Sequence, residues 1–275
     1  MLQALAAETP IDPVAGNPAS LSGNMISDSF AAGTESFRSV DEVQKTSNSV
    51  SVGLATGHFR AGDYVQNTFI LPLSYTIYFD NPGYQLRFDL PLNYTQVTDS
   101  SVYGTALGAS LRVPLSDTWS FTPGIRAGAT GSLDMASAAV VYAGTLTSNY
   151  TIPFNTFELN IGNMIGTTRT GSISWGSDFE IDYDLNNVVY KNGISFEGET
   201  QQKLLSRQTS WQASVAHTLI TGDDVFIDNY WDFSLSWGAR KQANNGIWNN
   251  LRLGATFTIG NHDYAGGRLN LGYTF

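Results

Sequence analysis

Apolar and polar residues alternate along most of the chain, from about residue 47 to the C-terminus. The stretch from Tyr84 to Thr95 is typical: apolar or aromatic residues occupy every even position, and the odd positions include Arg87, Asp89 and Asn93. Successive side chains of a strand point to opposite faces, so each such segment has one apolar and one polar face. The pattern predicts an all-β protein.

Strand length and the placement of aromatic residues separate a membrane barrel from a soluble β-sandwich, which alternation alone would also suit. Runs of ten or more alternating residues exceed the usual five or six of globular strands and match the about 9 to 11 of a tilted membrane strand. Phe69 and Phe79, or Tyr84 and Tyr94, lie at the two ends of an apolar band, where a lipid interface favours aromatic rings. We therefore expect a transmembrane antiparallel β-barrel.

Twelve strands are expected, an even number as in bacterial single-chain barrels. Short turns such as Ser116-Asp117 follow even-numbered strands, so they share the end of the barrel that holds the C-terminus, and we expect this end to face the periplasm. The strands are expected at about 47–59, 64–79, 84–97, 102–115, 118–130, 138–150, 155–166, 187–197, 209–220, 229–240, 247–259 and 266–275.

The connections at the other end are expected to be longer and acidic, as at 166–186, 221–228 and 260–266. Within the first of them, residues 178–185 alternate acidic and apolar side chains, which predicts a strand that projects beyond the membrane. The boundaries also leave 198–208 as a long periplasmic connection, which departs from the rule of short periplasmic turns.

Residues 1–45 form a separate segment ahead of the barrel at 46–275, because the alternation is absent there. The spacing of Met25, Ile26, Phe30, Phe37 and Val40 predicts a weakly amphipathic helix over about 26–44, although Gly33 disfavours it. The sequence Ala4-Leu5-Ala6 has the form of a signal-peptidase site; it is either the stub of a secretory signal or a chance run of small residues.

Composition narrows the classes of function. Charged residues make up 14% of the chain and the net charge is −10, which argues against nucleic acid as a partner. Cysteine is absent, which excludes disulfides and thiolate chemistry and fits passage through an oxidising periplasm. No stretch approaches the about 18 consecutive apolar residues of a spanning helix.

The last strand carries the most specific motif. Its alternating residues Leu269, Leu271 and Tyr273 end on the aromatic Phe275, which is similar to the assembly signal of outer-membrane barrels. A lone helix ahead of twelve strands also resembles the translocator domain of classical autotransporters. The resemblance implies a location in the bacterial outer membrane, contact with its lipid, recognition by the barrel-assembly machinery, and a helix inside the lumen. Only some twenty-five residues precede the expected helix, so a solitary barrel without a passenger is expected.

The expected lumen carries most of the arginines. Strand parity places nine charged residues inward, and four carboxylates of the expected helix could pair with the arginines among them, because guanidinium groups hold planar pairs well. The alternative is that these arginines hydrate the lumen or pair across neighbouring strands. The inward set is Arg87, Asp89, Arg112, Arg126, Glu158, Asp232, Arg240, Arg252 and Arg268, and the helix set is Asp28, Glu35, Asp41 and Glu42.

Catalytic candidates are few, since the chain has three histidines. His217 shares the lipid-facing side of its strand, as the general base of an outer-membrane lipid hydrolase would, but Ser234 and Ser236 on the next strand face inward and no partner is evident. An interfacial histidine is the simpler interpretation. The acidic stretch 178–184 lacks the wrapped oxygen cage of a calcium site, so neither a metal nor a cofactor is expected.

Three functions remain in competition for a non-enzymatic, monomeric barrel. A polar lumen suits a plugged or narrow pore for small polar solutes, and the resemblance suits a translocator-like role. Acidic extracellular loops suit a surface-exposed structural or binding barrel. A lipid hydrolase is the most distant alternative.

Overall fold

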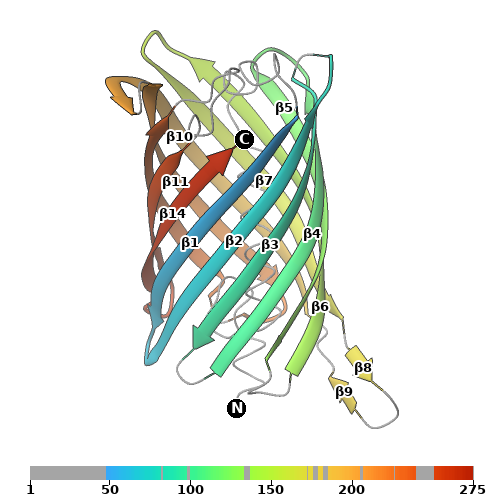
Figure 1. Cartoon of the computed structure of the whole chain (residues 1–275). Coiled ribbons are helices and arrows are strands. Elements are labelled where there is room, and N and C mark those ends of the chain that lie inside the picture. Colours follow the sequence, from blue (N-terminus) through green and yellow to red (C-terminus); the bar gives the residue numbers. More distant parts are fainter. Residues whose placement is uncertain are drawn as a thin grey trace.

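The computed structural model shows a closed antiparallel barrel of twelve strands (Figure 1). It describes residues 48–81, 83–97, 100–132, 137–171, 173–175, 179–181, 185–204, 207–225, 227–239 and 251–274. The order around the barrel is β1-β14-β13-β12-β11-β10-β7-β6-β5-β4-β3-β2, and β1 pairs with β14 to close the ring. The expected fold class and strand number are therefore confirmed.

The barrel strands are 9 to 19 residues long, as a tilted crossing of the membrane requires. Two further short strands, β8 (Ile173–Trp175) and β9 (Phe179–Ile181), form a separate hairpin that extends beyond the barrel in Figure 1. The barrel strands are β1 (Ser49–Ala61), β2 (Tyr64–Tyr78), β3 (Gln85–Val97), β4 (Ser100–Pro114), β5 (Trp119–Ser132), β6 (Ser137–Pro153), β7 (Phe157–Gly171), β10 (Asn186–Leu204), β11 (Arg207–Gly222), β12 (Asn229–Ala239), β13 (Arg252–Gly260) and β14 (Ala265–Thr274).

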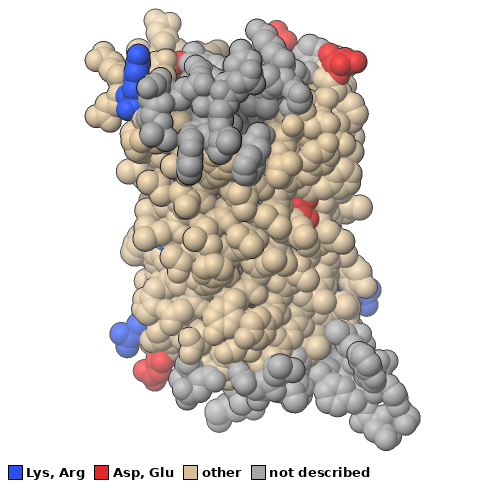
Figure 2. Space-filling model, in the orientation of Figure 1, with Lys and Arg blue, Asp and Glu red and all other residues tan. Residues whose placement is uncertain are grey.

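The alternation of the sequence sets the two faces of the wall. On β3, Phe88 is 43% exposed on the outer face, whereas the next residue, Asp89, is 6% exposed on the inner face. Every barrel strand exposes large apolar side chains on its outer face, and together they form an apolar belt. The charged side chains visible in Figure 2 lie mostly near the two ends of the barrel. A belt of this kind is the surface that a lipid bilayer covers.

The two ends of the barrel differ in what they carry. The start of β1 and the end of β14 lie together, since Ser51 pairs with Thr274, and we call this the terminal end. The opposite end carries the β8–β9 hairpin, between β7 and β10, and we call it the hairpin end. In Figure 1 the terminal end is uppermost.

The structure corrects the expected boundaries around the eighth barrel strand. β10 runs from Asn186 to Leu204 and β11 begins at Arg207, so the long connection expected at 198–208 does not exist. The strand was predicted to stop at 197 because the apolar alternation stops there. Backbone pairing needs no apolar side chain, and the polar residues after Gly198 continue the ladder past a register shift between Glu199 and Lys203.

The expected contrast in loop length is only partly correct. At the hairpin end β1 and β2 are joined by Gly62 and Asp63 alone, and β13 and β14 by a turn over Asn261–Tyr264. Gly62 adopts a φ of 57° there, a conformation that glycine takes without steric cost. The long connection at this end is the one that contains β8 and β9, so the stretch 178–185 does contribute a strand beyond the barrel wall.

Several predictions fall outside the described residues. They are the helix over 26–44 with its four carboxylates, the short turn at 241–246, Arg240 and Phe275. None of the described residues forms a helix long and apolar enough to cross a membrane.

Candidate functional site

The inner face of the barrel is the candidate site because its buried side chains are largely polar. The structure places eight of the nine residues expected in the lumen on inward strand positions, and the ninth, Arg240, is not described. That they line a conducting pore stays a prediction. The eight residues are Arg87, Asp89, Arg112, Arg126, Glu158, Asp232, Arg252 and Arg268.

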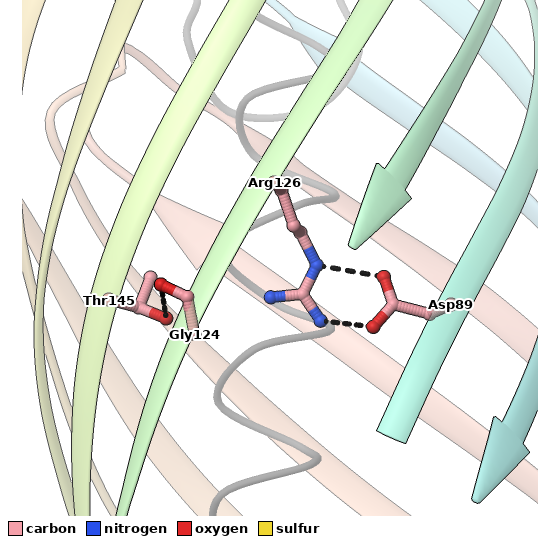
Figure 3. Close-up of polar contacts among 4 residues, drawn as sticks. All are labelled: Asp89, Gly124, Arg126 and Thr145. Carbon is pink, nitrogen blue, oxygen red and sulfur yellow. Dashed lines mark hydrogen bonds and ion pairs between the residues drawn. The ribbon is translucent and has the colours of Figure 1, made fainter. Parts of the chain in front are cut away.

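Asp89 on β3 and Arg126 on β5 form a two-pronged ion pair on this face (Figure 3). The guanidinium donates from Nε to Oδ2 at 2.9 Å and from Nη2 to Oδ1 at 2.8 Å. The two side chains are 5% and 1% exposed, so the pair is almost fully shielded from water. Such bidentate pairs are the strongest and most directional that side chains make.

A glycine on the strand between them makes this pair possible. Gly108 on β4 is the cross-strand partner of both Asp89 and Arg126. A Cβ at this position would lie 2.2 Å from Oδ2 of Asp89 and 2.8 Å from Nε of Arg126. The missing side chain therefore creates the passage through which the guanidinium crosses β4.

A second ion pair lies nearer the hairpin end and includes a residue that the sequence analysis missed. Lys191 on β10 donates from Nζ to Oδ2 of Asp232 on β12 at 2.9 Å, and Thr258 on β13 donates to Oδ1 at 2.8 Å. The ammonium also lies 5.5 Å from the ring centre of Tyr230. The inward parity of Lys191, between Val189 and Gly193, was the signal that could have identified it.

A third group of contacts joins β13 to the strands beside it. Arg252 donates to Oγ of Ser236 at 2.9 Å and to Oγ of Ser210 at 3.1 Å, and its Nη1 lies 3.8 Å from a carboxylate oxygen of Glu197. The Ser236 contact joins neighbouring strands, the Ser210 contact passes over β12, and the Glu197 contact passes over β11 and β12. The two shortest ion pairs each pass over one intervening strand, whereas the sequence analysis offered pairing between neighbouring strands as an alternative to pairing with the helix.

The remaining inward arginines differ in their surroundings. Arg112 is fully buried. In Arg87 and Arg268 the Nε atom is buried, and no described residue accepts a hydrogen bond from it. A buried donor of this kind costs free energy unless water or another group accepts a hydrogen bond from it. The inner face therefore offers hydrogen-bond donors beyond those used in its ion pairs.

An apolar cluster lies inside the barrel towards the hairpin end. Phe59 on β1 stacks on Tyr264 of the β13–β14 turn at 5.7 Å, and Ile227 from the β11–β12 connection is fully buried beside them. The same cluster includes Met164 on β7, and β7 is six steps from β1 in the ring of twelve strands, which puts it on the opposite wall. The members between these two strands lie on β10, β11 and β12 and on two connections at the hairpin end, so the cluster follows one half of the inner wall. Its buried members are Phe59, Ala61, Met164, Val189, Ile220, Ile227, Tyr230 and Tyr264.

His217 lies on the outer face, as expected, and the structure supplies the partner that the sequence analysis did not find. Its Nε2 lies 2.8 Å from Oδ1 of Asn229, and its ring packs 4.6 Å from that of Trp231. Asn229 carries neither a nucleophilic hydroxyl nor a carboxylate. This is the arrangement of a histidine held at a membrane interface among aromatic residues.

The expected assembly signal lies on the last strand of the barrel. Leu269 and Leu271 are exposed on the outer face of β14, and Tyr273 pairs with Val52 on β1 at the seam. The alternation of the motif thus coincides with the lipid-facing side of the closing strand. Recognition of this strand by the assembly machinery stays a prediction.

Comparison with solved structures shows which known proteins share this fold. No protein-family model and no curated protein matches the chain. Among solved structures it is similar to the β domain of the Bordetella autotransporter BrkA, with a TM-score of 0.61 and 12% identity over 83% of this chain and 99% of that one. It is also similar to the translocator domain of the autotransporter NalP from Neisseria meningitidis, with a TM-score of 0.55 and 14% identity over 95% and 99%. With its apolar belt and closed ring, the chain is an outer-membrane β-barrel whose fold is similar to that of autotransporter translocator domains.

Proposed function

We propose that this barrel is a gated, translocator-like pore for small polar solutes of the bacterial outer membrane, without enzymatic activity. The observation that carries the proposal is the polar and charged inner face, built from arginine, lysine and carboxylate side chains of many strands. A polar inner face of this kind is what a water-filled channel through a membrane barrel has. The terminal end then faces the periplasm.

The apolar cluster at the hairpin end supports the part of the proposal that the pore is gated. Water-filled passages close where an apolar constriction expels water, and polar solutes cannot cross such a region. Tyr264 and Ile227 belong to connections between strands, which move more readily than the wall itself. Their displacement would open the lumen without breaking the barrel.

Charges on the inner wall bear on the choice of solute. The described inward cations are Arg87, Arg112, Arg126, Lys191, Lys203, Arg252 and Arg268, seven in all, and the described inward carboxylates are Asp89, Glu158, Glu197, Glu199 and Asp232, five in all. A surplus of fixed cations raises the local concentration of anions. We expect a preference for anions in the protein that lacks residues 1–45, which carry the additional acidic side chains.

Conductance in planar bilayers tests the proposal in four forms of the protein. These are the full chain, the chain without residues 1–45, the Tyr264→Ser variant, and the two changes combined. We expect background conductance for the full chain, an increase for each single change, and the largest value for the combination. Tyr142→Ser is the matched control, because Tyr142 is exposed on the outer face. If the combined form conducts no more than the full chain, the barrel is not a pore.

A second candidate function rests on the β8–β9 hairpin, which extends beyond the barrel wall. A hairpin outside the membrane is a suitable element for binding at the cell surface. Replacing residues 172–185 by a short turn should abolish such binding and leave conductance unchanged. If this variant instead loses conductance while binding at the cell surface is unchanged, the result favours the pore over the binding function.

A further inference from the structure

Two asparagines face outward within the apolar belt. Asn163 on β7 and Asn192 on β10 are direct cross-strand partners, and both side chains are exposed on the outer face. Their outward neighbours along the strands are apolar: Ile161 and Ile165 flank Asn163, and Ile194 follows Asn192. We call the two residues the asparagine pair.

The asparagine pair lacks the partners that other outward amides have. Asn67 lies 2.9 Å from Nδ1 of His58, and Asn229 lies 2.8 Å from Nε2 of His217. No described residue hydrogen-bonds the side chain of either member of the asparagine pair. A carboxamide carries two donors and an acceptor, and hydrocarbon can satisfy none of them.

The pair is the centre of a row of polar residues across four adjacent strands. Ser148 on β6 is in register with Asn163, and His217 on β11 is in register with Asn192. The ends of the row are satisfied, since Ser148 accepts a hydrogen bond of 2.9 Å from Trp119 and His217 bonds an asparagine. Because barrel strands are tilted, the row runs obliquely across the membrane face, and only its centre lacks partners.

We propose that this row is the surface on which two copies of the chain associate in the membrane, which departs from the monomer expected from the sequence. The asparagine side chain is self-complementary, because each amide can donate to and accept from an identical group. Hydrogen bonds between membrane-embedded side chains stabilise association where the hydrophobic effect cannot. A second copy of the same surface therefore supplies the hydrogen-bond donors and acceptors that lipid hydrocarbon lacks.

The symmetry of such a dimer places the asparagine pair at its centre. Both copies insert in the same direction, so the twofold axis lies along the membrane normal and each residue meets residues at its own depth. Two oblique rows that face each other across this axis cross at one point. The unsatisfied centre of the row is the part that this crossing brings together.

Cysteine cross-linking in native membranes tests the proposal directly, because the chain contains no cysteine. Asn163→Cys should form a disulfide-linked species of twice the monomer mass on mild oxidation. Leu235→Cys is the control, since Leu235 is 61% exposed on the outer face of β12. Equal cross-linking at both positions would indicate random collision, and no cross-link at Asn163→Cys would mean that this face is not the centre of a dimer. A cross-link to a chain of different mass would identify another protein as the occupant. Each of these three results overturns the proposal.

A second measurement separates the asparagine pair from general hydrophobic contact. In lipid vesicles, Asn163→Leu with Asn192→Leu should raise the dissociation constant of the dimer by about tenfold or more, because hydrogen bonds are lost while the apolar surface increases. Asn67→Leu makes the same chemical change on β2 and should leave the constant unchanged. A tighter dimer in the double variant would show that packing alone drives association and would overturn the role of the amides.

Discussion

The guanidinium of Arg126 occupies the space that a side chain at Gly108 would fill. An ideal Cβ on Gly108 would lie 2.8 Å from both Cγ and Nε of Arg126, closer than such atoms approach in folded proteins. The glycine thus lets an arginine on β5 reach an aspartate on β3. A backbone position on one strand decides whether charges on two others can meet.

Gly108→Ala should therefore destabilise the barrel by about 2–4 kcal/mol, because the methyl group displaces Asp89 or Arg126 from the bidentate geometry and leaves buried charges poorly paired. Urea unfolding in lipid vesicles measures the change. Gly144→Ala is the control, since the nearest atom to a Cβ at Gly144 is 3.8 Å away. Equal free energies of unfolding for the two variants would contradict this explanation of Gly108.

The Lys191–Asp232 pair should behave as a buried pair whose members depend on each other. Asp232→Asn leaves the Lys191 ammonium, 6% exposed, without its counter-charge and should cost about 3–5 kcal/mol. Replacing both residues, Lys191→Met with Asp232→Asn, should restore much of that loss, because no buried charge then remains. A double-mutant cycle of unfolding free energies gives the coupling, and a coupling near zero would show that water already screens the pair.

Neighbouring residues on β11 test the assignment of the two faces. Val215 is on the outer face, in register with Phe233, and Ser214 is on the inner face, in register with Ser234. Val215→Arg should cost about 2–4 kcal/mol if it lies near the bilayer midplane, and Ser214→Arg should cost far less. The fraction of folded barrel in lipid vesicles, measured at increasing urea concentrations, gives the free-energy cost of each substitution. Similar costs would mean that this part of the barrel has no lipid-facing side.

Deleting Phe275 tests the expected assembly signal. The deletion should lower the amount of barrel inserted in the outer membrane of cells and leave refolding in detergent nearly intact, because the machinery that recognises the signal acts only in cells. Quantitative immunoblotting of membrane fractions measures the first and the heat-dependent gel shift of folded barrels the second. Unchanged insertion in cells would contradict the proposal that the barrel-assembly machinery recognises this signal.

Sequence alternation determined the class of fold, the number of strands and the two faces of each strand. These properties are local, because a side chain's face depends only on its parity within the strand. The same reasoning placed Asp89 and Arg126 inward without contact between them being visible. It failed where the apolar signal stopped before the strand did, as in β10 after Gly198.

Only the tertiary structure decided which inward residues meet. Asp89 and Arg126 are 37 positions apart, and Lys191 and Asp232 are 41 apart. Their contacts depend on strand register and on the small residues of the strand between them, neither of which the period of the pattern encodes. The same holds for Phe59 and Met164, which share one apolar cluster because strand pairing and the closure of β1 on β14 place their strands in one continuous wall. The two-residue period of the sequence specifies the face of the strand on which a side chain lies. Strand register and barrel closure specify which side chains of other strands it contacts.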